Sequence, residues 1–355
     1  MKILLAGATG AIGRPLVPLL VEAGHEVVGL TRRPDRIAQI EAAGARGVVC
    51  DVSTERDALL DVAHELQPDV VLDETTDLPQ RYDATDMRAF YAAMGPLRLH
   101  GSPNLLDASL LTGARHIFQS IAFLHQPGGR AGTDSPRTED DLVFLTDTPP
   151  PWDAALPIIA ALEQRTVERG GLVLRYGFLY GPGTHLAPGG QIHEDVRARK
   201  FPVIGGGRGR FSFCHVEDAA AATLAAVERP EVSGILQVVD DDPIAVRDWL
   251  PAFARELGAK KPLPAPRSSP GGWPAPCPST TPPRCPACPT PARSGSWTGH
   301  PPTRRCGLRA SRAGRPRRAR RGPSTRSRRR ARSRARSRTA PTSSPAGRSS
   351  GRRTR

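Results

Sequence analysis

The chain has 355 residues and a formal net charge of +15, a length that suits one large or two ordinary domains. The charge comes from one end: residues 262–355 contain 24 Arg and no acidic residue, which leaves 26 basic and 35 acidic residues, a net charge of −9, in residues 1–261. The larger part is therefore not a basic nucleic-acid-binding protein. No apolar run approaches the roughly 20 residues of a membrane span, and Arg14 and two prolines interrupt the leader-like start, so we expect a cytoplasmic chain without a membrane partner.

The first predicted elements surround a glycine-rich turn. Residues 2–6 are apolar and predict a strand, and residues 16–23 have the apolar period of a helix. Between them, Gly7, Gly10 and Gly13 suit a tight turn, a close approach of backbone to phosphate, and close packing of helix on strand. Strand, turn and helix in this order direct backbone N–H groups and the positive helix end at one point. This predicts a site for the pyrophosphate of a dinucleotide, the alternative being a turn without function.

Strands and helices continue to alternate as far as about residue 240. Strands are predicted at residues 2–6, 26–30, 46–50, 69–72, 116–120, 172–176 and 234–239, and helices at residues 16–23, 56–65, 102–112 and 155–169, with another helix beginning at Val216. Short apolar strands between amphipathic helices predict an α/β fold, a doubly wound parallel sheet (Rossmann-like). The loops rich in Gly, Pro and charge predict a small C-terminal substrate lobe, built from residues 125–153 and 181–263, over the carboxyl edge of the sheet, where ligands bind in such folds.

The composition changes abruptly after Leu263. From residue 264 to 355 the chain contains no Ile, Val, Phe, Tyr, Met or Lys, so it cannot bury enough apolar surface to offset its conformational entropy. We therefore divide the chain into a domain of residues 1–263 and a disordered, Arg/Pro-rich basic tail of residues 264–355. Arg, Pro, Ala and Gly have GC-rich codons, so we favour translation out of frame as the origin of the tail. The alternative is a genuine arm that binds nucleic acid or another polyanion.

Several segments of residues 1–263 resemble one known family in their order and spacing. They are Gly7-x-x-Gly10-x-x-Gly13, Asp51-Val52, the run Asn-Leu-Leu-Asp-Ala at residues 104–108, the run Arg-Tyr-Gly-Phe-Leu-Tyr-Gly-Pro-Gly at residues 175–183, and the run Phe-Cys-His-Val-Glu-Asp at residues 213–218. This succession is similar to the extended short-chain dehydrogenase/reductase superfamily, and within it to the NAD-dependent epimerase/dehydratase family of nucleotide-sugar enzymes.

The resemblance implies a set of cofactor-binding residues. The phosphates would be bound at Gly7, Thr9, Gly10, Ala11, Ile12 and Gly13, the adenine at Asp51 and Val52, and the rest of the cofactor at Thr75 and by the backbone at Gly177. The second strand is followed by Thr31 and Arg32, where a free ribose 2′-OH calls for a carboxylate and a 2′-phosphate calls for an arginine. We therefore predict NADP rather than NAD, the alternative being that the arginines here are solvated surface charges.

The chain departs from the family at the catalytic residues. Family members use a Tyr and a Lys four residues later, in which the Lys lowers the pKa of the Tyr for proton transfer. None of the four tyrosines here is followed by such a Lys. If Glu163 is aligned with the acidic residue that follows the Lys in the family, the two positions carry Ala155 and Ile159.

Other polar residues near the expected site have two interpretations each. Ser120, at the end of the fifth strand, matches the active-site Ser of the family and is our candidate catalytic residue, although strand-end serines are also common turn residues. Tyr180 and His185 could supply a proton or could simply pack, and His215 is interpreted as a strand-end histidine. The pair Cys285 and Cys288 lacks the second Cys or His pair of a structural zinc site, so we predict no metal.

These observations favour an NAD(P)-binding, diverged epimerase/dehydratase-type oxidoreductase. It would exchange hydride with a small sugar- or alcohol-like molecule while Ser120 orients the reacting oxygen. A non-catalytic protein that senses or binds NADP is the alternative. Binding of nucleic acid is expected only if the basic tail is genuine, and a homodimer is the assembly we consider.

Overall fold

A seven-stranded parallel sheet forms the centre of the chain. The computed structural model describes residues 1–266 except 80, 84–85, 125–138, 140–152 and 154, all within one unit, Met1–Ala310. The strand order is β11-β6-β5-β4-β1-β2-β3, and every pair is parallel. The strands are β1 (Lys2–Ala6), β2 (Glu26–Thr31), β3 (Arg46–Val49), β4 (Val70–Asp73), β5 (Arg115–Ile121), β6 (Leu172–Tyr176) and β11 (Gly234–Val238). All seven predicted strands are present, with ends within one residue of the prediction.

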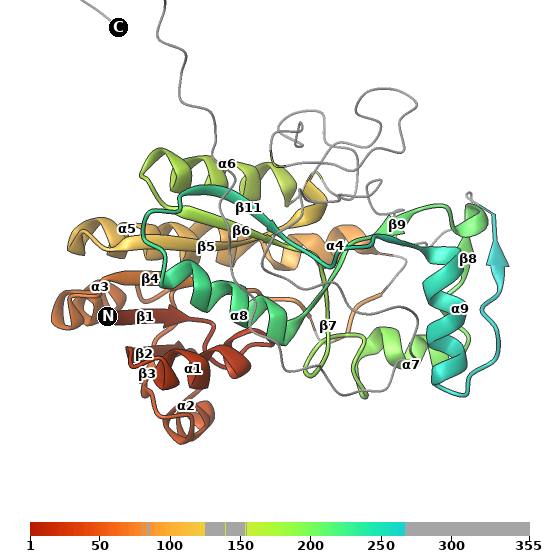
Figure 1. Ribbon diagram of the computed structural model, residues 1–355, viewed down its shortest axis with the longest axis horizontal. Helices are drawn as coiled ribbons and strands as arrows, with labels where there is room; N and C mark the ends of the chain where they lie inside the picture. Colours follow the sequence, from red (N-terminus) through yellow and green to blue (C-terminus); the bar gives the residue numbers. More distant parts are fainter. Residues whose placement is uncertain (80, 84–85, 125–138, 140–152, 154, 267–355) are drawn as a thin grey trace, which may run out of the picture. The chain divides into compact units, whose positions relative to one another are not determined.

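Helices cover both faces of this sheet (Figure 1). One face carries α1 (Gly13–Glu22) and α8 (Val216–Val227), whose Leu16, Leu20 and Ala219 are fully buried against it. The other face carries α3 (Arg56–Leu66), α5 (Ser102–Thr112) and α6 (Leu156–Glu168). The two short helices are α2 (Ile37–Ala42) and α4 (Met87–Ala93). The doubly wound α/β fold is confirmed.

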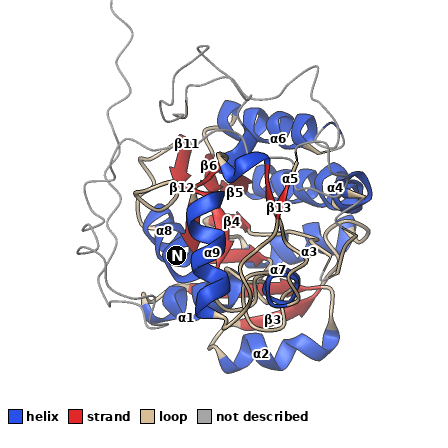
Figure 2. Cartoon of the chain, turned by 90° about the vertical axis from the view of Figure 1, so that its right-hand side faces the viewer, coloured by secondary structure: helices blue, strands red, loops and turns tan. Residues whose placement is uncertain are grey.

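The described residues after β6 build a smaller lobe around an aromatic core. Paired short strands join distant segments: β7 (Phe178–Tyr180) with β10 (Phe213–His215), β9 (Arg210–Phe211) with β12 (Ile244–Ala245), and β8 (Val203–Ile204) with β13 (Pro264–Ala265). Two helices, α7 (Gln191–Arg197) and α9 (Val246–Glu256), pack Ile192 and Trp249 into the cluster around Phe211. Figure 2 views the chain from the side of these two helices.

The described residues next to the predicted boundary at residue 263 pair with the lobe. Pro264 and Ala265 form β13, and the N–H of Val203 donates to the carbonyl of Leu263 at 2.8 Å. The predicted tail from residue 267 on, Cys285 and Cys288, and nearly all of residues 125–153 lie outside the described residues. No helix in the described part combines the length and apolarity needed to cross a membrane.

Candidate functional site

The turn between β1 and α1 depends on three glycines. Gly7 has φ = 89°, and a Cβ there would lie 2.3 Å from the carbonyl oxygen of Glu74. A Cβ on Gly13 would lie 2.1 Å from the carbonyl oxygen of Gly7, so this position requires glycine; α1 begins here rather than at the predicted residue 16. The N–H of Gly10 donates to the carbonyl of Gly7 at 2.9 Å and closes the turn. The backbone therefore forms a tight loop before a helix N-terminus, the geometry that suits a pyrophosphate.

The loop exposes some of its predicted cofactor residues and buries others. Thr9, Gly10 and Ala11 are half-buried and accessible, whereas Ile12 is only 4% exposed and packs into the core. Any contact of Ile12 with a phosphate would therefore be made by its backbone. These residues fit a dinucleotide, and their individual contacts remain predictions.

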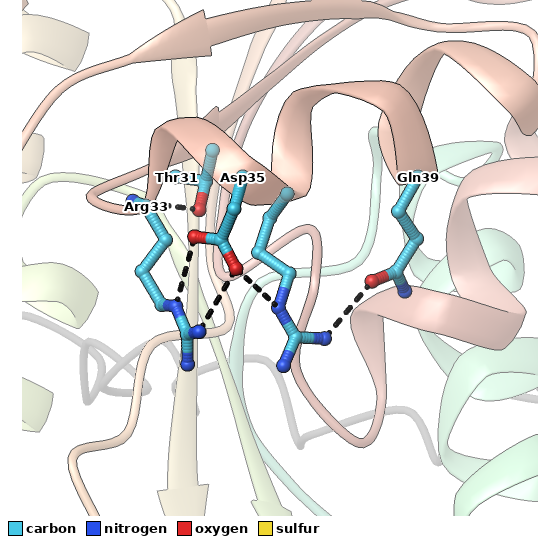
Figure 3. A network of polar contacts seen from close by, with 5 residues as sticks. Thr31, Arg33, Asp35 and Gln39 are labelled. Atoms are coloured by element: carbon cyan, nitrogen blue, oxygen red, sulfur yellow. Dashed lines mark hydrogen bonds and ion pairs between the residues drawn. The ribbon is translucent and has the colours of Figure 1, made fainter.

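The arginines that follow β2 form ion pairs with nearby carboxylates. The guanidinium of Arg32 donates to both carboxylate oxygens of Asp77, at 2.5 and 3.2 Å, and this hydrogen bonding raises the pKa of Arg32. Arg33 pairs with Asp35 at 2.9 Å, and its N–H donates to the hydroxyl of Thr31 (Figure 3). The side chain of Arg32 is 59% exposed. Arg32, the residue predicted to bind a 2′-phosphate, therefore lies at the surface and is already paired with the carboxylate of Asp77.

The carboxyl ends of β3 and β4 bring further predicted residues to this edge of the sheet. Asp51 accepts from the N–H of Ser53 at 2.9 Å, and its charge helps to raise the pKa of Arg32. The carbonyl of Val52 accepts from the side chain of Asn104 at 2.8 Å. Thr75 donates both its N–H (3.1 Å) and its hydroxyl to Asp73, so its polar atoms point back to the strand.

Ser120 belongs to a buried polar network between the sheet and α6. Its hydroxyl donates to Glu163 Oε1 at 2.5 Å, and Arg175 donates to both oxygens of Glu163, at 2.8 and 2.6 Å. Ser120 is 1% exposed, and the side chains of Glu163 and Arg175 are each 2% exposed. In this structure the hydroxyl of Ser120 therefore anchors Glu163, and its catalytic role remains a prediction.

Gly177 lies where two strands of different sheets pass closely. A Cβ there would lie 2.6 Å from the carbonyl oxygen of Ser212 and 2.8 Å from that of Phe213. The absence of a side chain thus lets β6 continue into β7 against β10. The backbone contact of Gly177 with the cofactor remains a prediction.

The two positions predicted to correspond to the family's Tyr and Lys are apolar and buried. Ala155 precedes α6, and Ile159 lies one turn later, with its N–H donating to the carbonyl of Ala155 at 3.1 Å. They are 4% and 3% exposed and pack in a cluster with Phe90, Met94 and Leu124. Neither side chain can move a proton.

An aromatic group that the sequence did not reveal adjoins this apolar cluster. The ring of Tyr82 meets the edges of Phe90 and His185 at centroid distances of 4.9 and 5.4 Å. The amide of Gln191 accepts from the N–H of Tyr82 (2.8 Å) and donates to its carbonyl (2.7 Å), so α7 holds this segment in place. Burial lowers the pKa of His185, which favours its neutral form. Tyr82 and Gln191 are 109 residues apart and follow no sequence pattern.

The remaining candidates have structural partners. Burial raises the pKa of Tyr180, whose ring meets that of His215 at 5.0 Å. His215 precedes α8 and accepts from the N–H of Glu217 at 3.3 Å through Nδ1, so it caps the helix, as a strand-end residue can. Among the described residues, no group of three or more His, Cys, Asp or Glu side chains could hold a metal ion.

Comparisons with known proteins agree with this architecture. The model of the NAD dependent epimerase/dehydratase family matches residues 3–238. The "3-diazoavenalumate denitrifying reductase" of a Streptomyces species is 41% identical over 271 residues, which are 75% of this chain and 85% of that protein.

Two of the solved structures share the fold of this chain. The UDP-glucose 4-epimerase of Thermotoga maritima has a TM-score of 0.61 and 17% identity, over 79% of this chain and 89% of that one. The enzyme WbmH of Bordetella bronchiseptica, in complex with NAD+, has a TM-score of 0.60 and 18% identity, over 79% of this chain and 88% of that one. A family match of this length, joined to a relative of this identity, means that the chain belongs to the NAD-dependent epimerase/dehydratase family.

Proposed function

We propose that the chain is an NADPH-dependent reductase whose substrate is a small aromatic diazo compound, from which hydride displaces dinitrogen. The observation that carries this proposal is the apolar character of Ala155 and Ile159. Interconversion of a carbonyl and an alcohol couples hydride transfer to a proton transfer at oxygen, which a positioned acid or base must supply. The sugar- or alcohol-like substrate expected from the sequence would therefore need a proton donor that these positions do not offer.

Reduction of an aromatic diazonium group needs no such donor. NADPH, when bound, would supply hydride, so that a C–H bond would form while the C–N bond breaks and its electron pair leaves with N2. The charges balance, because the cation loses its positive charge as the nicotinamide gains one. The chain's own residues would bind the aromatic ring and exclude water, a task that suits Tyr82, Phe90 and the neutral ring of His185. The name of the Streptomyces relative supports this substrate class.

The preference for NADPH rests on the residues that follow β2. Thr31 occupies the position where a carboxylate would bind a free ribose hydroxyl, and Arg32 follows it. Exposed ion pairs such as that of Arg32 with Asp77 contribute only about 0–1 kcal/mol. A phosphate dianion can therefore replace Asp77 as the partner of Arg32 with little loss.

Cofactor titration and product analysis test the proposal in sequence. We expect the full chain to bind NADPH more tightly than NADH by nicotinamide fluorescence. Arg32→Ala should weaken NADPH about tenfold or more, since hydrogen bonds to charged groups contribute about 1.5–3 kcal/mol, and should leave NADH unchanged. The control is Arg56→Ala, because Arg56 is also a half-exposed arginine paired with an aspartate, at 3.2 Å from Asp107 of α5.

Turnover is then measured with 4-hydroxybenzenediazonium. NADPH deuterated at the transferred position should yield N2 and an arene that carries the deuterium. Tight NADPH binding without N2 release from this or related diazonium salts would contradict the reductase proposal. It would favour the second candidate, a protein that binds or senses NADP without catalysis, which the same apolar positions also allow.

A further inference from the structure

Glu74 forms the floor of the glycine loop. It follows β4, its N–H donates to the carbonyl of Ala6 at 3.1 Å, and its own carbonyl oxygen faces the Cα of Gly7, where a Cβ would lie only 2.3 Å away. The main chain of residue 74 is thus packed directly beneath the first glycine of the predicted pyrophosphate site.

The side chain of Glu74 begins a buried chain of short polar contacts. Glu74 Oε1 lies 3.0 Å from the hydroxyl oxygen of Tyr176. The hydroxyl oxygens of Tyr176 and Thr223 are 2.6 Å apart, and that of Thr223 lies 2.8 Å from the carbonyl oxygen of Ala219. Glu74, Tyr176 and Thr223 are 4%, 1% and 0% exposed. Tyr176 and Thr223 come from β6 and α8, so the chain of contacts links β4 to both.

Counting hydrogens along this chain favours a protonated carboxyl group. The carbonyl of Ala219 can only accept, so the hydroxyl of Thr223 donates to it. The 2.6 Å contact between the hydroxyls then uses the hydrogen of Tyr176. Glu74 Oε1 lies 3.0 Å from the hydroxyl of Tyr176 and also 3.3 Å from that of Thr223, so the two hydroxyl hydrogens serve four contacts unless the carboxyl group adds a third hydrogen. Three of the four contacts can therefore be satisfied together when Glu74 is neutral, and only two when it is ionised.

Electrostatics act in the same direction. Burial raises the pKa of Glu74 to about 8, the hydroxyls of Tyr176 and Thr223 oppose the rise, the charge of Asp73 adds to it, and the charge of Arg98 opposes it. The groups that face the carboxyl group are Asp73 of β4, Tyr176 of β6, Thr223 of α8 and Arg98 of the helical turn Leu97–Gly101. The main chain of Glu74, rather than its carboxyl group, lies against Gly7 of the glycine loop. A buried negative charge here would also repel a pyrophosphate in the loop, because water screens little of the interaction.

We propose that Glu74 is a proton-binding positioning residue of the cofactor site, so that the chain binds dinucleotide with Glu74 neutral and loses affinity when Glu74 ionises. The proposal rests on the proposed cofactor site and is independent of the proposed substrate. By linkage, the affinity for NADPH is constant while Glu74 is protonated in the free chain and falls up to tenfold per pH unit above that range. Binding at high pH then takes up close to one proton.

The test is the dissociation constant of NADPH for the full chain between pH 7 and pH 10, a range in which the phosphates of NADPH no longer titrate. Wild type should bind equally well near pH 7 and 7.5 and about tenfold or more weakly at pH 9.5. Glu74→Gln, which keeps the shape and stays neutral, should bind as wild type does at pH 7 and should hold that affinity to pH 9.5. Calorimetry in two buffers of different ionisation enthalpy at pH 9 should show proton uptake by wild type and none by Glu74→Gln.

The outcomes separate this inference from the proposed function. Wild type that binds at pH 7 with no pH dependence, or Glu74→Gln with the same pH dependence as wild type, overturns the role of Glu74 and leaves the cofactor site intact. Wild type that fails to bind at pH 7 overturns both. Thermal melts of the two proteins at pH 7 show whether Glu74→Gln is folded. If it is not, the proton uptake of wild type at pH 9, compared with that at pH 7, decides the matter.

Discussion

Replacement of Ser120 by alanine distinguishes a structural serine from a catalytic one. The substitution removes the hydrogen bond that Ser120 donates to Glu163 Oε1 at 2.5 Å. Hydrogen bonds to charged groups contribute about 1.5–3 kcal/mol, and Glu163 keeps both bonds from Arg175, so we expect the lower part of that range, about 1.5–2 kcal/mol. In a domain of this size, 1 kcal/mol corresponds to about 2–4 °C. The melting temperature should therefore fall by about 3–8 °C.

The assay is thermal and urea denaturation of the full chain, together with turnover per folded molecule. Ser109→Ala is the matched control, because Ser109 is equally buried but donates only to the main-chain carbonyl of Leu106 at 2.6 Å. It should lower the free energy of unfolding by only about 0.5–1 kcal/mol, the lower part of the range for a hydrogen bond between neutral groups. Ser120→Ala should keep turnover within a few-fold of wild type. Unchanged stability together with a hundredfold loss of turnover would refute the structural role and would make Ser120 the catalytic residue that the sequence predicts.

Three further substitutions test the packing. Gly7→Ala should abolish NADPH binding and strongly destabilise the chain, because the new Cβ would meet the carbonyl oxygen of Glu74. Its control is Gly24→Ala, since Gly24 has a similar φ of 82° but open space around it. In urea unfolding, Gly24→Ala should cost only the left-handed backbone strain of about 1–2 kcal/mol. Glu163→Ala leaves the guanidinium of Arg175 buried without its partner and should lower the free energy of unfolding by about 3–5 kcal/mol; a loss below 1 kcal/mol would contradict this. Burial lowers the pKa of His116 to about 4, so the folded chain resists protonation and should lose about 2–3 kcal/mol of stability relative to His116→Gln as the pH falls from about 6.5 to 4. Equal pH dependence of the two proteins in urea titrations would show that His116 titrates normally.

The central fold could be predicted because its determinants are local. Buried parallel strands are continuous apolar runs, and residues 172–176 are identical to the predicted strand. The start of α1 was missed, because apolar periodicity begins at Leu16 whereas the backbone turns into the helix as soon as Gly13 permits. The paired strands of the lobe are only two or three residues long, too short to show a period of two.

The site could be predicted only where one segment builds it. The glycine loop is contiguous, and its geometry agrees with the sequence motif. The network around Ser120 joins residues that lie 43 and 12 positions apart, and the contact of Glu74 with Thr223 spans 149 positions. A single sequence contains no signal for such pairs, so Ser120 could be identified as a candidate but its partners could not.

The ion pair between Glu163 and Arg175 has a consequence for which side chains can change at the neighbouring positions of α6. Residues 159 and 163 are spaced four apart and therefore lie along one side of α6, and residue 155 comes immediately before the helix. Because the ion pair holds residue 163 against the sheet, it fixes the rotation of the helix about its axis, whichever side chains occupy positions 155 and 159. The side chains at those two positions can therefore change while the backbone that carries them stays in place. Replacing Ala155 by Tyr and Ile159 by Lys would then add two reactive side chains four residues apart without any rebuilding of the backbone at Glu163 and Arg175.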